Sequence, residues 1–244
     1  MTTSEDTLLQ GRLFLEQPAR GAGYRFNLDS VLLSGFTLTN PDGHILDLGA
    51  GCGVIGLMLL LSGKVARVTA VEIQPELARL ARKNAQKNGF SEREFSLLEG
   101  DLRRLDLPEV DGVVFNPPYF RPDQGQPSKC VGRDLARHER NGGLEDFVSV
   151  GASQLRPGGR LSAIVPLARS EDLIKACQDS GLGKTKVRWV RPRIHGERRQ
   201  LLLEAQTSVK LEHCEMEDLI VHEQTGPSFT EEVTRWLEGG EWKD

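Results

Sequence analysis

The sequence ILDLGAGCGVIG occupies residues 45–56 and decides the fold class. In it, a short apolar run leads into a glycine-rich turn, and an apolar helical pattern follows from Val54 to Ser62. Glycine lets the backbone approach a ligand closely, and a helix that begins there directs free N–H groups toward it. A strand, a glycine turn and a helix in this order indicate an α/β fold that binds a nucleotide-like cofactor, and nicotinamide cofactors fit this pattern as well.

The segments around this turn alternate short apolar runs with longer amphipathic ones, which is typical of a mostly parallel sheet with helices on both faces. The predicted parallel strands are residues 44–48, 67–72, 95–99, 112–115 and 160–165, and the predicted helices are 54–62, 75–88, 144–155, 173–180 and 231–237. Two more strands, 186–190 and 200–205, form a hairpin that places an antiparallel strand at the sheet edge. This pattern predicts a seven-stranded, Rossmann-like methyltransferase sheet better than a dinucleotide-binding sheet.

The composition of the 244 residues is that of an ordinary globular protein, with 38% hydrophobic and 27% charged residues. The longest apolar stretch, residues 54–61, is far shorter than the roughly 20 residues of a membrane-spanning helix, and the polar start of the chain resembles no secretory signal. Four scattered cysteines form no CxxC pair, so we expect free thiols and no metal site. We therefore expect a cytoplasmic monomer that does not associate with membranes.

Charge is distributed unevenly along the chain. The formal net charge is −4, yet residues 184–199 carry a net charge of +6 and residues 205–244 a net charge of −7. A local basic patch of this density fits a polyanionic partner, although the overall balance is acidic.

Two carboxylates follow predicted strands on the side of the glycine turn. Glu72 ends the strand 67–72, 19 residues after Gly53. A carboxylate at this place can accept hydrogen bonds from both ribose hydroxyls of a nucleoside, although a solvated glutamate at a strand end is the alternative. Asp101 follows the strand 95–99 and either accepts from an adenine amino group or caps its own turn.

The motif Asn116-Pro117-Pro118-Tyr119 directly follows the buried run 113–115. The two prolines fix φ and offer no N–H, so the rigid loop presents the Asn116 side-chain oxygen and the Pro117 carbonyl as two acceptors. Two acceptors in one plane can hold both hydrogens of an –NH2 group and favour a nitrogen whose lone pair is free to attack. Tyr119 offers an aromatic face on which a flat base can stack. We therefore predict a catalytic role for these four residues.

These motifs resemble the class I S-adenosylmethionine-dependent methyltransferases that modify amino nitrogens. Segments outside the shared core resemble, more narrowly, the bacterial tRNA adenine-N6 methyltransferases that act on the adenosine beside the anticodon of a valine tRNA. The segments that carry this resemblance are 23–33, 136–139, 191–193, 199–205 and 219–223. The resemblance covers nearly the whole chain; the acidic C-terminal segment is the part without a match.

The resemblance implies S-adenosylmethionine as the cofactor and tRNA as the partner. It implies one methyltransferase domain at residues 41–244, with residues 1–40 as an N-terminal extension or lid that packs on the core. The cofactor-binding residues expected from the motifs are Asp47, Gly49, Gly51, Gly53, Glu72, Asp101 and Asn116. The residues expected to contact RNA are Arg137 and His138, in a loop beside the catalytic motif, and Arg191, Arg193 and Arg199, in the basic hairpin.

Three other functions stay open at this point. A protein glutamine-N5 methyltransferase uses the same four-residue motif, because a side-chain amide poses the same chemical problem. Those enzymes carry a helical domain before the core, whereas 46 residues precede Asp47 here. A guanine-N2 rRNA methyltransferase and a non-catalytic RNA-binding protein are the remaining alternatives.

Overall fold

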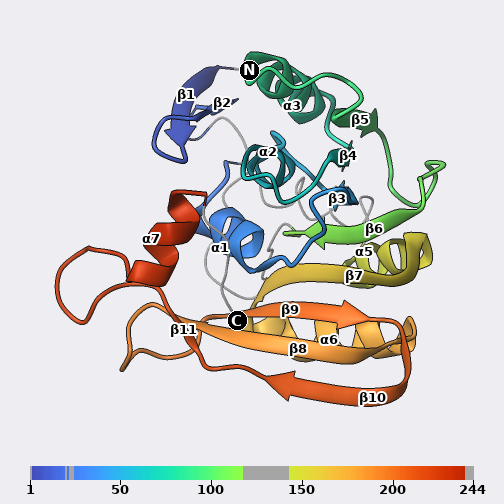
Figure 1. The fold of residues 1–244 in the computed structure, drawn as a ribbon, viewed down its shortest axis with the longest axis vertical. Coiled ribbons are helices and arrows are strands. Elements are labelled where there is room, and N and C mark those ends of the chain that lie inside the picture. The colour runs from blue at the N-terminus through green and yellow to red at the C-terminus, as the bar shows by residue number, and fades with distance from the viewer. Residues whose placement is uncertain (1, 20, 22–24, 118–142, 240–244) are drawn as a thin grey trace.

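The computed structural model describes residues 2–19, 21, 25–117 and 143–239 (Figure 1). A nine-stranded sheet forms its centre, in the order β10-β8-β9-β7-β6-β3-β4-β5, with β11 also pairing with β8. The strands of this sheet are β3 (His44–Leu48), β4 (Arg67–Glu72), β5 (Phe95–Glu99), β6 (Val110–Phe115), β7 (Leu155–Pro166), β8 (Leu182–Arg191), β9 (Gln200–Gln206), β10 (Ser208–Glu215) and β11 (Leu219–Ile220). The helices are α1 (Leu28–Phe36), α2 (Val54–Leu61), α3 (Pro75–Lys87), α5 (Leu144–Gln154), α6 (Ser170–Asp179) and α7 (Glu231–Leu237), with a 3-10 turn, η1 (Leu167–Arg169).

The predicted fold class is confirmed, and the sheet is two strands wider than expected. All seven predicted strands are present. The antiparallel strand β9 lies inside the sheet, because it pairs with β7 on one side and with β8 on the other. The two additional strands, β10 and β11, pair parallel with β8. Strand β10 is exposed along nearly its whole length, so it lacks the buried face from which a sequence pattern reveals a strand.

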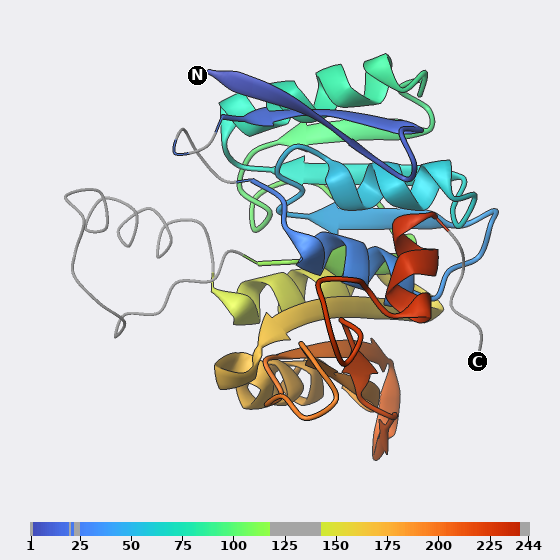
Figure 2. The same cartoon turned by 90° about the vertical axis from the view of Figure 1, so that its left-hand side faces the viewer.

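Helices cover both faces of the sheet (Figures 1 and 2). Helices α1, α2 and α3 pack on one face, where α7 joins α1, and α5 and α6 pack on the other. Side chains alternate along each strand accordingly. In β3, Ile45 joins the buried cluster under α1 and α2, whereas Leu46 and Leu48 join the cluster under α5 and α6. No helix of the described residues is long and apolar enough to cross a membrane.

An N-terminal hairpin that the sequence patterns did not predict packs against α3 and α2. It consists of β1 (Thr3–Leu8) and β2 (Leu13–Pro18), which pair in a separate two-stranded sheet. Strand β1 alternates exposed with half-buried positions, a weak signal, whereas β2 is almost entirely buried. Its Leu13 and Leu15 belong to the same cluster as α2. The hairpin and α1 thus pack on the core, and the role of residues 1–40 as an N-terminal extension or lid stays a prediction.

The parallel register brings four strand ends to one edge of the sheet. Leu48, the last residue of β3, pairs with Val71 on one side and with Phe115, the last residue of β6, on the other. Glu72 at the end of β4 pairs with Glu99 at the end of β5. The residues that follow these strands therefore lie together at the carboxyl edge, where open α/β sheets bind their ligands.

Candidate cofactor and substrate site

The glycine turn after β3 needs glycine at three positions. Gly49, Gly51 and Gly53 have φ angles of 70°, 59° and 85°, in the left-handed region that other residues rarely adopt. A Cβ atom on Gly49 would lie 3.0 Å from the Phe147 ring, and one on Gly53 would lie 3.1 Å from the Phe95 ring. The turn is therefore packed from behind by the protein itself, which fixes its shape.

Four N–H groups of this turn donate hydrogen bonds within the protein. Gly49 and Ala50 donate to the Val71 carbonyl at 2.8 and 3.0 Å, and Gly53 donates to the Ala50 carbonyl at 2.9 Å. Gly51 donates to Glu72 Oε2 at 2.8 Å. A dinucleotide's pyrophosphate needs N–H groups of the turn that are free to donate to it, whereas these four already have partners. The turn therefore fits a nucleoside cofactor without phosphates, such as S-adenosylmethionine, better than a nicotinamide dinucleotide.

Glu72 is buried, with 4% of its surface exposed, so the alternative of a solvated glutamate is wrong. Besides the Gly51 N–H, its carboxylate accepts the N–H of Gln74 at 2.8 Å. Burial raises the pKa of Glu72, although these backbone donors oppose the rise. Each carboxylate oxygen can accept a second donor. Glu72 thus fixes the turn, and its contact with the hydroxyls of a ribose stays a prediction.

Asp47 lies beneath the glycine turn, with 1% of its surface exposed. Its Oδ2 accepts the Gly56 N–H of α2 at 3.1 Å. Its Oδ1 has no hydrogen-bond partner among the described residues. Burial raises its pKa to about 7, and the neighbouring Glu72 contributes in the same direction. A buried carboxylate with an unpaired oxygen costs stability, which is typical of a functional position.

Asp101 follows β5 and forms the turn cap that the sequence left as one of two possibilities. Its Oδ1 accepts the Arg103 N–H at 3.0 Å, and its Oδ2 accepts from Arg103 Nη2 at 2.7 Å. These bonds lower the pKa of Asp101. Contact with an adenine ring stays a prediction for this residue.

Asn116 follows β6 beside the glycine turn, because Phe115 pairs with Leu48, the residue before Gly49. Phe115 is fully buried and packs on Phe147 of α5, with 5.6 Å between the ring centroids. Asn116 itself is 7% exposed, and Pro117 is half-buried. The strand end is therefore rigidly seated. Pro118 and Tyr119 lie outside the described residues, as do Arg137 and His138 of the predicted RNA-contacting loop.

The basic hairpin is largely paired with the acidic C-terminal segment. Arg191 forms an ion pair with Asp218, and Arg198 pairs with Asp218 and Glu215 at 2.8 Å each. Arg193 donates to the carbonyl oxygens of residues 223 and 226. This pairing accounts for the uneven charge of the sequence.

Arg199 is the most accessible of the three hairpin arginines that are expected to contact RNA. Its side chain is 65% exposed, and its ion pair with Glu197 is long, at 3.6 Å. It precedes Gln200, which pairs with Pro166 at the carboxyl end of β7. Arg199 therefore lies at the same edge of the sheet as the glycine turn.

One ion pair beside this hairpin is buried, and we expect its loss to destabilise the fold. Arg188 contacts Glu232 of α7 through two hydrogen bonds of 2.5 and 2.8 Å, and its side chain is 9% exposed. Arg188→Ala should lower the free energy of unfolding by about 2 kcal/mol, because Glu232 is left partly buried without a partner. Urea denaturation measures this change.

The matched control is Arg235→Ala on α7, the helix that also carries Glu232. Arg235 pairs with Glu231 at 3.4 Å, and the Glu231 side chain is 93% exposed, so we expect a change below about 0.5 kcal/mol. Equal effects of the two substitutions would contradict a structural role of the Arg188 pair.

Sequence reasoning missed Asn84, which lies in the middle of α3 and is 0% exposed. Its Nδ2 donates to the carbonyl of Cys52 in the glycine turn at 2.9 Å. A signal was present, because Asn84 continues the apolar stripe of Leu77 and Leu80 at helical spacing. A polar residue within such a stripe is buried and needs partners.

The described residues contain no group of three or more His, Cys, Asp and Glu side chains that could hold a metal ion. They contain three free cysteines, Cys52, Cys177 and Cys214, and Cys130 lies outside the described residues.

Comparisons with known proteins bear on the family and the fold. The model of the family described as methyltransferase small domain matches residues 27–171. A relative from Porphyromonas gingivalis, named tRNA1(Val) (adenine(37)-N6)-methyltransferase, is 33% identical over 84% of each chain. A relative of the same name from Pedobacter heparinus is 37% identical over 68% of this chain and 70% of its own.

Solved structures share the fold. A protein from Agrobacterium tumefaciens, described as a predicted O-methyltransferase, is 25% identical and superposes with a TM-score of 0.71 over 88% of this chain and 98% of its own. TYW2 of M. jannaschii in complex with AdoMet has a TM-score of 0.57 at 14% identity, over 84% and 85% of the two chains. With the glycine turn, Glu72 and Asn116 at one edge of this fold, the chain belongs to the methyltransferase small domain family and is an S-adenosylmethionine-dependent methyltransferase.

Proposed function

We propose that this enzyme methylates the N6 amino group of an adenine in tRNA, namely the adenosine beside the anticodon of a valine tRNA. The observation that carries the proposal is Asn116 with Pro117 at the end of β6, directly beside the glycine turn that follows β3. The names of the relatives support the substrate, since each is a tRNA1(Val) (adenine(37)-N6)-methyltransferase. A tRNA substrate also implies that the enzyme acts in the cytoplasm, and we propose that it does so as a monomer.

The residues of the site have distinct roles in this proposal. S-adenosylmethionine, when bound, supplies an electrophilic methyl group. Glu72 accepts the ribose hydroxyls, Asp101 lies near the adenine ring of the cofactor, and residues 1–40 cover the cofactor. The Asn116 side-chain oxygen and the Pro117 carbonyl accept the two hydrogens of the substrate amino group, and Tyr119 stacks on the substrate base.

This mechanism needs no general base. The lone pair of an adenine amino nitrogen is delocalised into the ring, and hydrogen bonds to both hydrogens favour a more tetrahedral nitrogen. The methylated nitrogen is strongly acidic and loses its proton to water. Turning the adenine out of its stack costs a few kcal/mol, which is least in an RNA loop.

The experiment that tests the proposal is methyl transfer from labelled S-adenosylmethionine into bulk tRNA, rRNA and a release factor, followed by nucleoside and amino-acid analysis. We expect N6-methyladenosine in tRNA. Label in the release factor would assign the same site to glutamine methylation, and N2-methylguanosine in rRNA would replace the substrate. Cofactor binding without any transfer would favour the non-catalytic RNA-binding alternative.

For the RNA contact, Arg199 is the residue with the clearest prediction. Arg199→Ala should weaken tRNA binding and lower the slope of log K against log salt concentration by about one, the effect of one lost phosphate contact. Fluorescence anisotropy over a range of salt concentrations measures both quantities. The control is Arg93→Ala, which also removes one exposed positive charge. Arg93 lies in the turn before β5, at the opposite edge of the sheet. Equal slopes for the two variants would show that the basic hairpin faces away from the RNA.

A further inference from the structure

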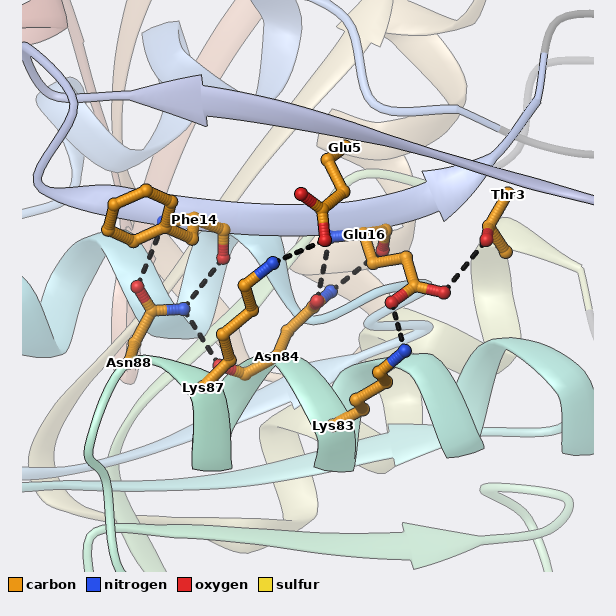
Figure 3. Close-up of polar contacts among 8 residues, drawn as sticks. All are labelled: Thr3, Glu5, Phe14, Glu16, Lys83, Asn84, Lys87 and Asn88. Atoms are coloured by element: carbon orange, nitrogen blue, oxygen red, sulfur yellow. Dashed lines mark hydrogen bonds and ion pairs between the residues drawn. The ribbon is translucent and has the colours of Figure 1, made fainter.

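Asn84 connects the N-terminal hairpin to the glycine turn. Its Oδ1 accepts the N–H of Glu16 in β2 at 2.7 Å, and its Nδ2 donates to the Glu16 carbonyl at 2.9 Å (Figure 3). The same Nδ2 donates to the Cys52 carbonyl at 2.9 Å. With one acceptor and two donor hydrogens in use, this fully buried amide holds two segments that are far apart in the sequence in one fixed geometry.

Asn88, one helical turn later, binds the backbone of β2 in the same way as Asn84 but does not contact the glycine turn. Its Oδ1 accepts the Phe14 N–H at 2.9 Å, and its Nδ2 donates to the Phe14 carbonyl at 2.7 Å (Figure 3). The second bond of Nδ2 goes to the Asn84 carbonyl within α3, at 2.7 Å. The two asparagines thus bind alternate residues of β2 much as a neighbouring strand would, and of the two, Asn84 is the one that reaches the glycine turn.

Charged side chains fasten the same hairpin to α3. The Glu16 carboxylate accepts from Thr3 Oγ1 at 2.8 Å and pairs with Lys83, and these two partners lower its pKa. Lys87 pairs with Glu5 of β1 at 2.5 Å (Figure 3). Several bonds thus fix the position of Glu16, and Asn84 connects Glu16 to Cys52 by hydrogen bonds to both.

Cys52 lies between Gly51 and Gly53 in the glycine turn, and two side chains bind neighbouring backbone groups of this turn. Glu72 holds the Gly51 N–H, and Asn84 holds the Cys52 carbonyl. We propose that Asn84 is a positioning residue of the cofactor site, and that through it the N-terminal hairpin is part of that site. This inference rests on the proposed assignment of the glycine turn to S-adenosylmethionine.

The test compares Asn84→Asp with Asn88→Asp. Each substitution keeps the size of the side chain and the Oδ1 acceptor, and each removes the donors to β2; Asn84→Asp alone also removes the donor to the turn. We expect Asn84→Asp to raise the Kd for S-adenosylmethionine about tenfold, which equals roughly 1.4 kcal/mol, by isothermal titration calorimetry. Asn88→Asp should change that Kd by less than about twofold, because a contact outside the turn contributes little to binding. In steady state, Asn84→Asp should raise KM for the cofactor and leave kcat and KM for the RNA unchanged.

A second pair of measurements separates the possible failures. Gly51→Val is incompatible with the φ of 59° in the turn and should abolish cofactor binding. Normal binding by Gly51→Val would overturn the assignment of the turn itself. If Gly51→Val fails to bind but the Asn84 and Asn88 variants share one Kd, the assignment stands and the coupling through Asn84 is wrong.

Hydrogen exchange provides a readout that needs no ligand. We expect the Gly51 and Gly53 amides to exchange faster in Asn84→Asp than in Asn88→Asp, and equal rates would contradict the proposal. Should Asn84→Asp fail to fold, Asn84→Ser, whose hydroxyl can donate one of the two bonds, takes its place against Asn88→Ser with the same expected order.

Discussion

Asn116→Ala is expected to lower kcat for methyl transfer about 10³-fold, a loss of roughly 4 kcal/mol of transition-state stabilisation. The substitution removes one of two acceptors for the substrate amino group, and these bonds strengthen as the nitrogen becomes tetrahedral in the transition state. A group that acts mainly in the transition state changes kcat more than ground-state binding. Single-turnover transfer to unmodified tRNA, with cofactor binding followed by calorimetry, measures the two effects separately.

Asn116→Asp is the matched variant, because it keeps an acceptor oxygen at the same place. We expect it to retain more activity than Asn116→Ala while losing the amide's donor. Asn116 is nearly buried at the end of β6, so thermal unfolding of both variants must show that the strand end is intact. Near-normal turnover of a folded Asn116→Ala would exclude the proposed mechanism.

Local signals in the sequence predicted the parallel strands and the residues that the structure brings together at one edge of the sheet. The glycine turn, Glu72 and Asn116 each follow a buried apolar run, and parallel strands bring such positions to one edge whatever the packing around them. This is why the seven predicted strands and the predicted cofactor class agree with the structure and the comparisons. The glycine turn by itself did not distinguish a dinucleotide from S-adenosylmethionine, because the sequence does not specify which N–H groups the turn leaves free for a ligand.

The N-terminal hairpin and its link to the site depend on contacts between distant residues. Asn84 and Glu16 are 68 positions apart, and no periodic pattern connects a polar residue in an apolar stripe with its partner. The pairing of the basic hairpin also depends on residues that are distant in the sequence. Its charge predicted an acidic partner, but charge alone does not distinguish a phosphate from a carboxylate of the same chain, and Asp218 is that partner for Arg191 and Arg198.

Asp47→Asn is expected to remove a pH dependence from the stability of this protein. Burial raises the pKa of Asp47 from 3.8 to about 7 in the folded state, so the folded protein binds this proton more tightly than the unfolded chain does. The free energy of unfolding therefore falls as the pH rises from about 4 to about 7, and is constant with respect to this group above that range. A shift of this size corresponds to roughly 4 kcal/mol, since one pKa unit is about 1.4 kcal/mol. The stability of Asp47→Asn relative to the natural protein should thus rise by about that amount between pH 4 and pH 8.

Urea denaturation at several pH values measures this difference, and Asp111→Asn is the control of opposite sign. Asp111 accepts the His44 N–H at 2.8 Å and pairs with Arg156 at 3.0 Å, which lowers its pKa. Its contribution is present above the unfolded pKa and is lost as the pH falls, so Asp111→Asn should lose stability at neutral pH and little in acid. Parallel pH profiles of stability for the natural protein and Asp47→Asn would contradict a raised pKa of Asp47 in the folded state. Diverging profiles would show that Asp47 lowers the stability of the fold at neutral pH, where an asparagine would be more stable. Such a loss of stability is expected at a position that is kept for function.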